Sequence, residues 1–243
     1  MRLLHIHKTG SSLRLILASG LALACLSIAA SSADAASITT FKNSLQSTTA
    51  RKEIKQYSGK ANCDRGGSKK SFRLEVGKRT KECAFRVPFV GRNVGITATG
   101  RLFKSTPKKV KSQAYLSVSV RQDTDGSRYQ LCVFPSGHRF QLRKIFPNGK
   151  IQNLENGKAG KKIAGFSEAN RLTLRAYNDQ QGNPSGSAGI VASVNGHRLA
   201  AVVDPRGNSL EGQDTTFSIG SKKSARGARG SFVKLSGTQP DPF

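Results

Sequence analysis

The chain has 243 residues, 36% of them hydrophobic, and a formal net charge of +26. This apolar fraction excludes a chain that is disordered throughout, and the length allows one large all-β domain or two small ones. A charge of this size attracts polyanions such as acidic glycans, wall phosphates, anionic membranes or nucleic acid, although charge alone does not fix the partner.

Residues 1–35 have the pattern of a signal peptide. Basic residues at positions 2, 8 and 14 accompany an apolar stretch from Leu13 to Ala30, and the sequence ADA at 33–35 predicts cleavage after Ala35. A retained membrane anchor and a lipoprotein attached at Cys25 are the alternatives. Because no later segment could span a bilayer, we expect a secreted or cell-surface protein without a transmembrane segment. Its charge would be +24, since the leader carries three basic residues and one acid.

The remaining chain divides into three parts by composition. Residues 36–62 form a polar N-terminal extension that could add an edge strand or a short helix, residues 63–237 form the main domain, and residues 238–243 form a tail. Within the domain, short runs of β-branched and aromatic residues alternate with polar ones, as in half-buried strands. The expected strands are Ser71–Val76, Cys83–Val90, Val94–Leu102, Ala114–Arg121, Arg128–Phe134, His138–Phe146, Arg171–Tyr177, Gly189–Val194, Arg198–Asp204, Thr216–Gly220 and Ser231–Leu235.

Turn residues separate these runs. The pairs Asp-Gly at 125–126 and Asn-Gly at 148–149 and 195–196 suit turn positions that require a positive φ. No segment shows a sustained helical period. Strands spaced about ten residues apart predict an all-β fold, an antiparallel two-sheet β-sandwich.

Three cysteines follow the leader: Cys63, Cys83 and Cys132. Export to an oxidising compartment predicts one disulfide. We expect Cys63–Cys83, because it is the shortest closure and would flank one hairpin, with Cys132 as a buried free thiol in an apolar strand. The spacing alone leaves the other two pairings open.

The second half of the domain resembles a known family. Residues 170–176 (NRLTLRA), 194–196 (VNG), 199–204 (LAAVVD) and 217–220 (FSIG) are similar to successive strands and turns of bacterial concanavalin A-like lectin/glucanase domains. Residues 129–134 and 140–143 are similar to the central strands of these domains. The resemblance covers 110–236 well and 63–109 loosely, and it implies a jelly-roll fold. The superfamily includes lectins, laminin-G-like modules, glycosidases and 3-keto-disaccharide hydrolase-like domains, so it does not fix an activity.

The sequence departs from the active glucanases of this superfamily. Those enzymes carry an E-x-D-x-E strand whose glutamates act as nucleophile and acid/base, and no such triplet occurs here. A carboxylate pair could still assemble from distant positions, for which Glu82, Asp204 and Glu211 are the candidates. Ion-paired or solvated acids are the alternative, and we assign no catalytic residue.

No cofactor or metal site is expected. Asp123 and Asp125 could begin a calcium site, but they precede Gly126 in an apparent turn with few neighbouring oxygen ligands. His138 and His197 lack the Cys/His spacing of a zinc site.

Basic clusters are the main functional signal. They occur in five predicted loops, at 69–70, 78–81, 108–111, 158–162 and 222–229. A single cluster is usually a solvated turn, but five with few intervening acids create a long-range positive field. The expected ligand-binding residues are Lys158, Lys161, Lys162, Lys222, Lys223, Arg226 and Arg229. Arg139, Gln141 and Arg143 alternate along one strand and predict a further polar, basic sheet face.

These observations favour a non-catalytic lectin-like module that binds an anionic polysaccharide or cell-envelope polymer. The chain has no Trp and only four Tyr, so aromatic platforms for neutral sugars or for single-stranded nucleic acid are scarce, and specific nucleic-acid binding is not expected. The alternatives are a glycoside-active enzyme of the 3-keto-disaccharide hydrolase-like kind and a structural or protein-interaction domain.

Overall fold

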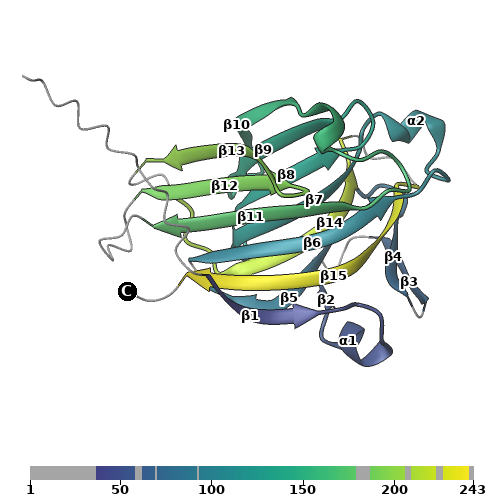
Figure 1. The fold of residues 1–243 in the computed structure, drawn as a ribbon, viewed down its shortest axis with the longest axis horizontal. Helices are drawn as coiled ribbons and strands as arrows, with labels where there is room; N and C mark the ends of the chain where they lie inside the picture. The colour runs from purple at the N-terminus through teal and green to yellow at the C-terminus, as the bar shows by residue number, and fades with distance from the viewer. Residues whose placement is uncertain are drawn as a thin grey trace, which may run out of the picture. The chain divides into compact units, whose positions relative to one another are not determined.

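The protein is a sandwich of two antiparallel sheets (Figure 1). The computed structural model describes residues 37–57, 62–68, 70–91, 93–178, 187–205, 209–222 and 227–240. Over these ranges the first sheet has eight strands in the order β13-β12-β11-β6-β15-β4-β3, with β1 paired to β15. The second has seven strands in the order β10-β9-β8-β7-β14-β5-β2. No described helix is long and apolar enough to cross a membrane.

Strands far apart in sequence are neighbours in both sheets. The first sheet contains β1 (Ser37–Asn43), β3 (Cys63–Ser68), β4 (Ser71–Val76), β6 (Val94–Leu102), β11 (Asn170–Asn178), β12 (Ala188–Val194), β13 (His197–Asp204) and β15 (Arg229–Pro240). The second contains β2 (Lys55–Gln56), β5 (Glu82–Val90), β7 (Ala114–Gln122), β8 (Arg128–Phe134), β9 (Arg139–Ile145), β10 (Ile151–Lys158) and β14 (Asp214–Ser221). The short helices are α1 (Thr48–Lys52), α2 (Lys108–Lys111) and the 3₁₀ turn η1 (Gly160–Lys162).

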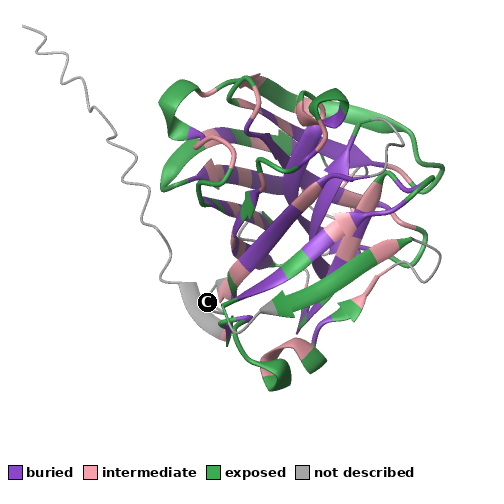
Figure 2. Ribbon diagram, turned by 90° about the vertical axis from the view of Figure 1, so that its right-hand side faces the viewer, coloured by how far each residue is buried: buried purple, intermediate pink, exposed green. Residues whose placement is uncertain are grey.

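The core lies between the sheets because alternate side chains of each strand point inward. Figure 2 shows buried residues along the strands and exposed residues in the connecting loops. Four phenylalanines from four strands meet at one end of this core: Phe72, Phe85, Phe217 and Phe232. The ring centroids of Phe217 and Phe232 are 4.8 Å apart, and those of Phe72 and Phe85 are 5.1 Å apart. Edge-to-face contacts of this kind join the first sheet to the second.

The fold class expected from the sequence is confirmed, and every expected strand is present within a few residues. Two strands were missed. Strand β10 is almost entirely exposed and therefore lacks apolar alternation, and β3 has the sequence CDRGGS, with neither β-branched nor aromatic residues. The segment 36–62, expected as an extension, contributes β1, α1 and β2, so each sheet receives a strand from it.

The expected disulfide is confirmed, but its position differs from the expected one. Cys63 is bonded to Cys83, with 5.7 Å between their Cα atoms, and Cys132 is free and buried. Strand β3 belongs to the first sheet and β5 to the second, so the bond links the two sheets instead of flanking a single hairpin. Strand β4 forms a hairpin with β3. After β4 the chain crosses to the second sheet, so β4 and β5 do not form a hairpin.

A buried ion pair joins the sheets at another point. Lys144 Nζ of β9 donates to Asp204 Oδ2 of β13 at 2.7 Å, and the two side chains are 2% and 6% exposed. Tyr129 also donates its hydroxyl hydrogen to Asp204 and accepts from the backbone N–H of Leu210. Breaking a buried pair leaves an uncompensated charge, so this network fixes β13 against the second sheet.

The disulfide should account for a measurable part of the stability. We expect the double substitution Cys63→Ser and Cys83→Ser to lower the free energy of unfolding by about 3 kcal/mol, because it releases a loop whose ends are 20 residues apart. Denaturant unfolding would measure this change. As a control, a reductant should destabilise the wild type and leave the double variant unchanged. Equal stability of both proteins without reductant would contradict the prediction.

Candidate functional site

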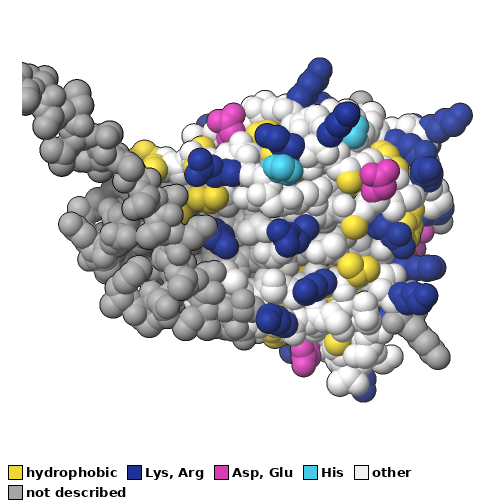
Figure 3. Space-filling view, viewed as in Figure 1, with side chains coloured by type: hydrophobic (Ala, Val, Ile, Leu, Met, Phe, Trp, Pro, Cys, Tyr) yellow, Lys and Arg dark blue, Asp and Glu magenta, His cyan; other side chains and the backbone are white. Residues whose placement is uncertain are grey.

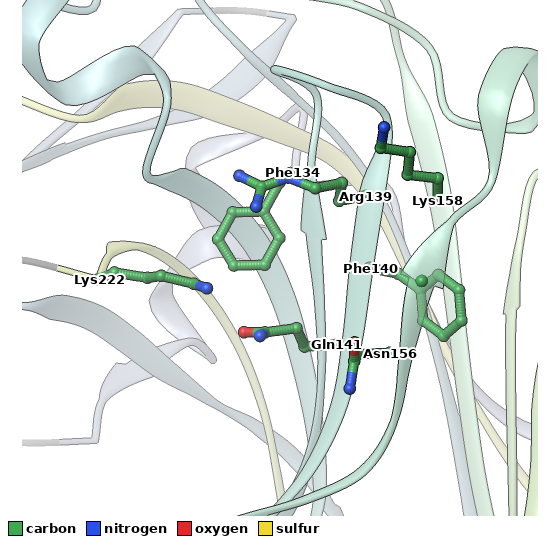
Figure 4. A pocket seen from close by; sticks show the side chains of 8 residues that line it. Phe134, Arg139, Phe140, Gln141, Asn156, Lys158 and Lys222 are labelled. Atoms are coloured by element: carbon green, nitrogen blue, oxygen red, sulfur yellow. The ribbon is translucent and has the colours of Figure 1, made fainter.

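The outer face of the second sheet carries a shallow pocket near its β10 edge. Its volume is about 190 Å³, and Figure 4 shows Arg139, Gln141 and Lys222 gathered around Phe134, while Phe140 points away from them. The described residues that line it are Phe134, Arg139, Phe140, Gln141, Asn156, Gly157, Lys158 and Lys222. None of them is acidic.

Strand register builds this pocket. Phe134 of β8 pairs with Arg139 of β9, and Arg139 pairs with Lys158 of β10, so the three side chains form one row across the sheet. In the next row Gln141 pairs with Asn156. Directly opposed residues of antiparallel strands point to the same face, so both rows face the same solvent.

Two cations pack over the aromatic floor of the pocket. Lys222 Nζ lies 5.1 Å from the centroid of the Phe134 ring, and the Arg139 guanidinium carbon lies 5.6 Å from it. Phe134 is only 1% exposed because these groups cover it. Lys222 follows β14, and its backbone N–H donates to the carbonyl of Gln113 at 3.2 Å. A hydrogen bond from Ala159 N to His138 O, 2.8 Å long, holds the chain beside Lys158.

The row places two like charges directly opposite each other. Arg139 and Lys158 are cross-strand partners, an arrangement that costs stability in a sheet. Arg139 donates a hydrogen bond to the Ser112 carbonyl at 3.2 Å. Because this acceptor is neutral, it does not compensate the positive charge of Arg139. The pocket is therefore electrostatically unfavourable when empty, and an anion would relieve the repulsion between the two cations.

The structure brings together two of the residues expected to bind ligand, Lys158 and Lys222. Lys161 and Lys162 are exposed on η1, immediately after β10, and do not line the pocket. Arg229 lies on β15 of the other sheet, 2.9 Å from Glu75. Lys223 and Arg226 lie outside the described residues.

Sequence reasoning missed Phe134, Phe140, Asn156 and Gly157. It did signal Arg139 and Gln141 through their alternation on one strand. Arg143, the next residue of that alternation, is buried: it donates to Gln130 Oε1 at 2.6 Å and to the Tyr115 hydroxyl at 3.3 Å.

Further along the same face, Glu82 is surrounded by donors. Arg128 Nη2 lies 2.8 Å from its carboxylate, and Gln130, Ser117 and Ser218 also donate to it. Burial acts to raise the pKa of Glu82, but the charges of Arg128 and Arg143 and these hydrogen bonds outweigh burial and lower it below the usual range. Glu82 therefore stays ionised, which is unsuited to a general acid.

The three acids considered for catalysis do not come together. Glu82 lies on the outer face of the second sheet, Asp204 lies inside the sandwich, and Glu211 is an exposed loop residue. Cys132 is likewise no nucleophile, because burial raises the pKa of its thiol to about 12.

Asp123 and Asp125 belong to the turn between β7 and β8. Asp125 Oδ1 accepts from the backbone N–H of Ser127 at 2.7 Å, and Gly126 has a φ of 89°. No cluster of three metal-ligating side chains occurs in the described ranges.

Known structures share this fold at low sequence identity. No protein-family model matches the sequence, and no curated protein matches it either. A galectin-like protein of unknown function from Bacillus subtilis superposes with a TM-score of 0.57 at 12% identity, covering 83% of this chain and 96% of that one. The carbohydrate-binding module CBM66 from Bacillus subtilis gives 0.52 at 11% identity, covering 75% and 94%. The Crh5 transglycosylase gives 0.55 at 8%, covering 84% and 86%.

These matches confirm the resemblance found in the sequence: the chain has the concanavalin A-like jelly-roll fold. The matched structures include a binding module and an enzyme, so the fold by itself does not select between the two.

The network around Glu82 should be sensitive to charge and to pH. Glu82→Gln should destabilise the protein by about 3 kcal/mol at neutral pH, because it removes a buried partner of Arg128. The pKa of Glu82 is lowered in the folded state, so its contribution is present above the usual glutamate pKa and is lost as the pH falls below it. The difference between wild type and variant should therefore shrink in acid.

Denaturant unfolding of both proteins across this pH range would measure the difference. Glu155→Gln is the matched control, since Glu155 is exposed on β10 and should change the free energy of unfolding by less than about 0.5 kcal/mol. If Glu82→Gln lowers the free energy of unfolding by the same amount at every pH, the lowered pKa of Glu82 is contradicted.

Proposed function

We propose that this protein is an exported, non-catalytic binding module that takes an anionic glycan or cell-envelope polymer into the pocket of Phe134, Arg139, Gln141, Asn156, Lys158 and Lys222. The observation that carries the proposal is the like-charge pair Arg139–Lys158. A third cation, Lys222, lies over the Phe134 ring of the same pocket. A folded protein that opposes two cations across a pair of strands gives up stability, and an anionic ligand offsets that cost.

The lining suits an acidic sugar. Arg and Lys supply charge-assisted hydrogen bonds to a carboxylate or sulfate, while the amides of Gln141 and Asn156 donate to and accept from hydroxyl groups. Arg139 and Lys222 lie over the Phe134 ring, so stacking of a neutral sugar on that ring has little room. Lys161 and Lys162, just beyond Lys158, extend the positive surface along a longer ligand.

Two observations support the export of this protein. The leader pattern at 1–35 and a disulfide that joins the two sheets both suit an oxidising compartment. The structures that share the fold include a carbohydrate-binding module, a protein of unknown function with a galectin-like fold and a transglycosylase, and the first agrees best with a pocket whose described lining has no carboxylate.

Binding should depend on ionic strength. We expect affinity for polygalacturonate to fall steeply as salt rises, because the Debye length falls from about 10 Å at 0.1 M to about 3 Å at 1 M. The triple substitution of Arg139, Lys158 and Lys222 by Gln should weaken binding roughly 10- to 100-fold, at about 1 kcal/mol or less for each exposed contact.

Calorimetry or biosensor titration across a salt series would measure this affinity. The triple substitution of Lys52, Lys55 and Lys78 by Gln is the matched control, since these exposed lysines do not line the pocket and remove the same charge. Neutral reduced polygalacturonate serves as the control ligand. Equal weakening by both variants, or preference for the neutral polymer, would refute the pocket.

The like-charge pair also makes a prediction without any ligand. Lys158→Gln should leave the free protein equally stable or raise its free energy of unfolding by roughly 0.5 kcal/mol, because the repulsion from Arg139 is removed. Lys150→Gln, in the exposed turn before β10, should change nothing measurable. Thermal unfolding at low salt is the measurement, and clear destabilisation by Lys158→Gln would contradict the argument.

A further inference from the structure

The outer face of the first sheet is strongly one-sided in charge. Six of its eight strands form most of it: β13, β12, β11, β6, β15 and β1. In these six described strands the one acidic residue is Asp204, which points inward and pairs with Lys144, while the remaining strands β3 and β4 carry Asp64 and Glu75. Figure 3 shows Lys and Arg side chains spread over this face, with Asp and Glu towards its margins.

A row of hydroxyl side chains crosses the middle of this face. The register aligns one residue from each strand, in the order Lys42, Ser236, Thr97, Thr173, Ser193 and Arg198. Thr97 and Thr173 are joined by a hydrogen bond of 3.0 Å between their hydroxyls. We call these six residues the hydroxyl row. With neighbouring strands about 4.8 Å apart, it extends for roughly 24 Å and has a cation at each end.

Further cations flank the hydroxyl row. Lys234 and Arg171 lie in the row beside it, both paired with Thr99 between them, and both are exposed. Their backbones are two strand spacings apart, roughly 10 Å. Arg175 lies on the other side of the hydroxyl row, four residues along β11 from Arg171.

Solubility alone does not require this arrangement. A soluble surface usually intersperses charges of both signs, since large single-sign fields are unfavourable unless they serve attraction. Several described acids are paired with cations, as in Glu82–Arg128 and Asp214–Arg86 of the second sheet and Glu75–Arg229 between β4 and β15. The face of the first sheet instead combines cations with hydroxyl groups over six strands.

We propose that this face is a second binding surface, for an extended acidic polysaccharide, and that the protein thereby cross-links two such chains. The cations match the carboxylates or sulfates of the polymer, and the hydroxyl row matches its sugar hydroxyls along the length of the chain. A flat array suits an extended polymer, whereas the pocket suits one or two sugar units.

The cross-linking part rests on the proposed function, because the pocket is the other site. The pocket opens on the outer face of the second sheet and the hydroxyl row lies on the outer face of the first, with the core between them. One polymer chain therefore binds on each side of the sandwich.

The test compares three triple substitutions to Gln that each remove three positive charges. The face variant changes Arg171, Arg198 and Lys234; the pocket variant changes Arg139, Lys158 and Lys222; and the control variant changes Lys52, Lys55 and Lys78. Long polygalacturonate is mixed with each protein, and light scattering measures cross-linking. Binding of a short polygalacturonate oligomer is measured separately, and circular dichroism with thermal unfolding confirms that each variant is folded.

The face variant is expected to bind the short oligomer like the wild type and to lose at least roughly tenfold of the scattering, as expected when about 1.4 kcal/mol of binding is lost. The control variant should scatter like the wild type. The proposal is overturned if the face variant scatters like the control, or if all three variants fall equally, because the effect would then come from net charge. It is also overturned if the face variant loses binding to vesicles of anionic lipid but not to the polymer.

Failure of the proposed function gives a different result. If the pocket variant binds the short oligomer like the wild type, the pocket is not the binding site and the proposed function is refuted. Immobilised long polymer then still tests the second surface alone, since the face variant should bind it more weakly than the control variant. Equal binding by these two variants would overturn the second surface.

Discussion

The packing of two sheets through their inward-facing side chains is the constraint on which the rest of the structure depends. Each strand can bury only every second residue, so the other residues must face outward whatever their chemistry. The aromatic contacts among Phe72, Phe85, Phe217 and Phe232 and the Cys63–Cys83 bond hold the sheets together near one end. The Lys144–Asp204 pair connects β9 to β13 within the sandwich. Because the two sheets are held together in this way, the side chains on their outer faces lie at the spacings set by strand register.

Four acids of this basic chain form ion pairs that hold the structure together. Asp204 is enclosed in the core, Glu82 is held by four donors, and Asp214 and Glu75 pair with arginines. Because these carboxylates neutralise particular cations near or inside the sheets, the remaining lysines and arginines dominate the field outside. The result is a protein whose two outer faces are both basic but are organised differently.

The organisation of the faces separates two kinds of recognition. On the second sheet, a pocket is lined by three cations and two amides, and two of the cations lie over the Phe134 ring, a geometry for a compact anionic group. On the first sheet, cations are spread around hydroxyl groups in strand register, a geometry for a long chain. The absence of Trp from the sequence agrees with both, since neither surface relies on aromatic stacking.

The sequence by itself determined most strand positions, the sandwich class and the strongly basic character, because these follow from local alternation, turn residues and composition. It favoured the Cys63–Cys83 pairing but left the other two pairings open, and the structure decided between them. The sequence could not reveal β10, most of whose residues are exposed, so that the strand shows no apolar period. Tertiary structure alone decided that Lys158 and Lys222 share a pocket with Phe134 while Arg229 lies on the other sheet. It also decided that Glu82 lies on the outer face of the second sheet, whereas Asp204 of the first sheet points into the sandwich. The physical reason is that side-chain alternation is a property of each strand, whereas strand order and register arise from pairing between segments up to two hundred residues apart, as in β1 with β15.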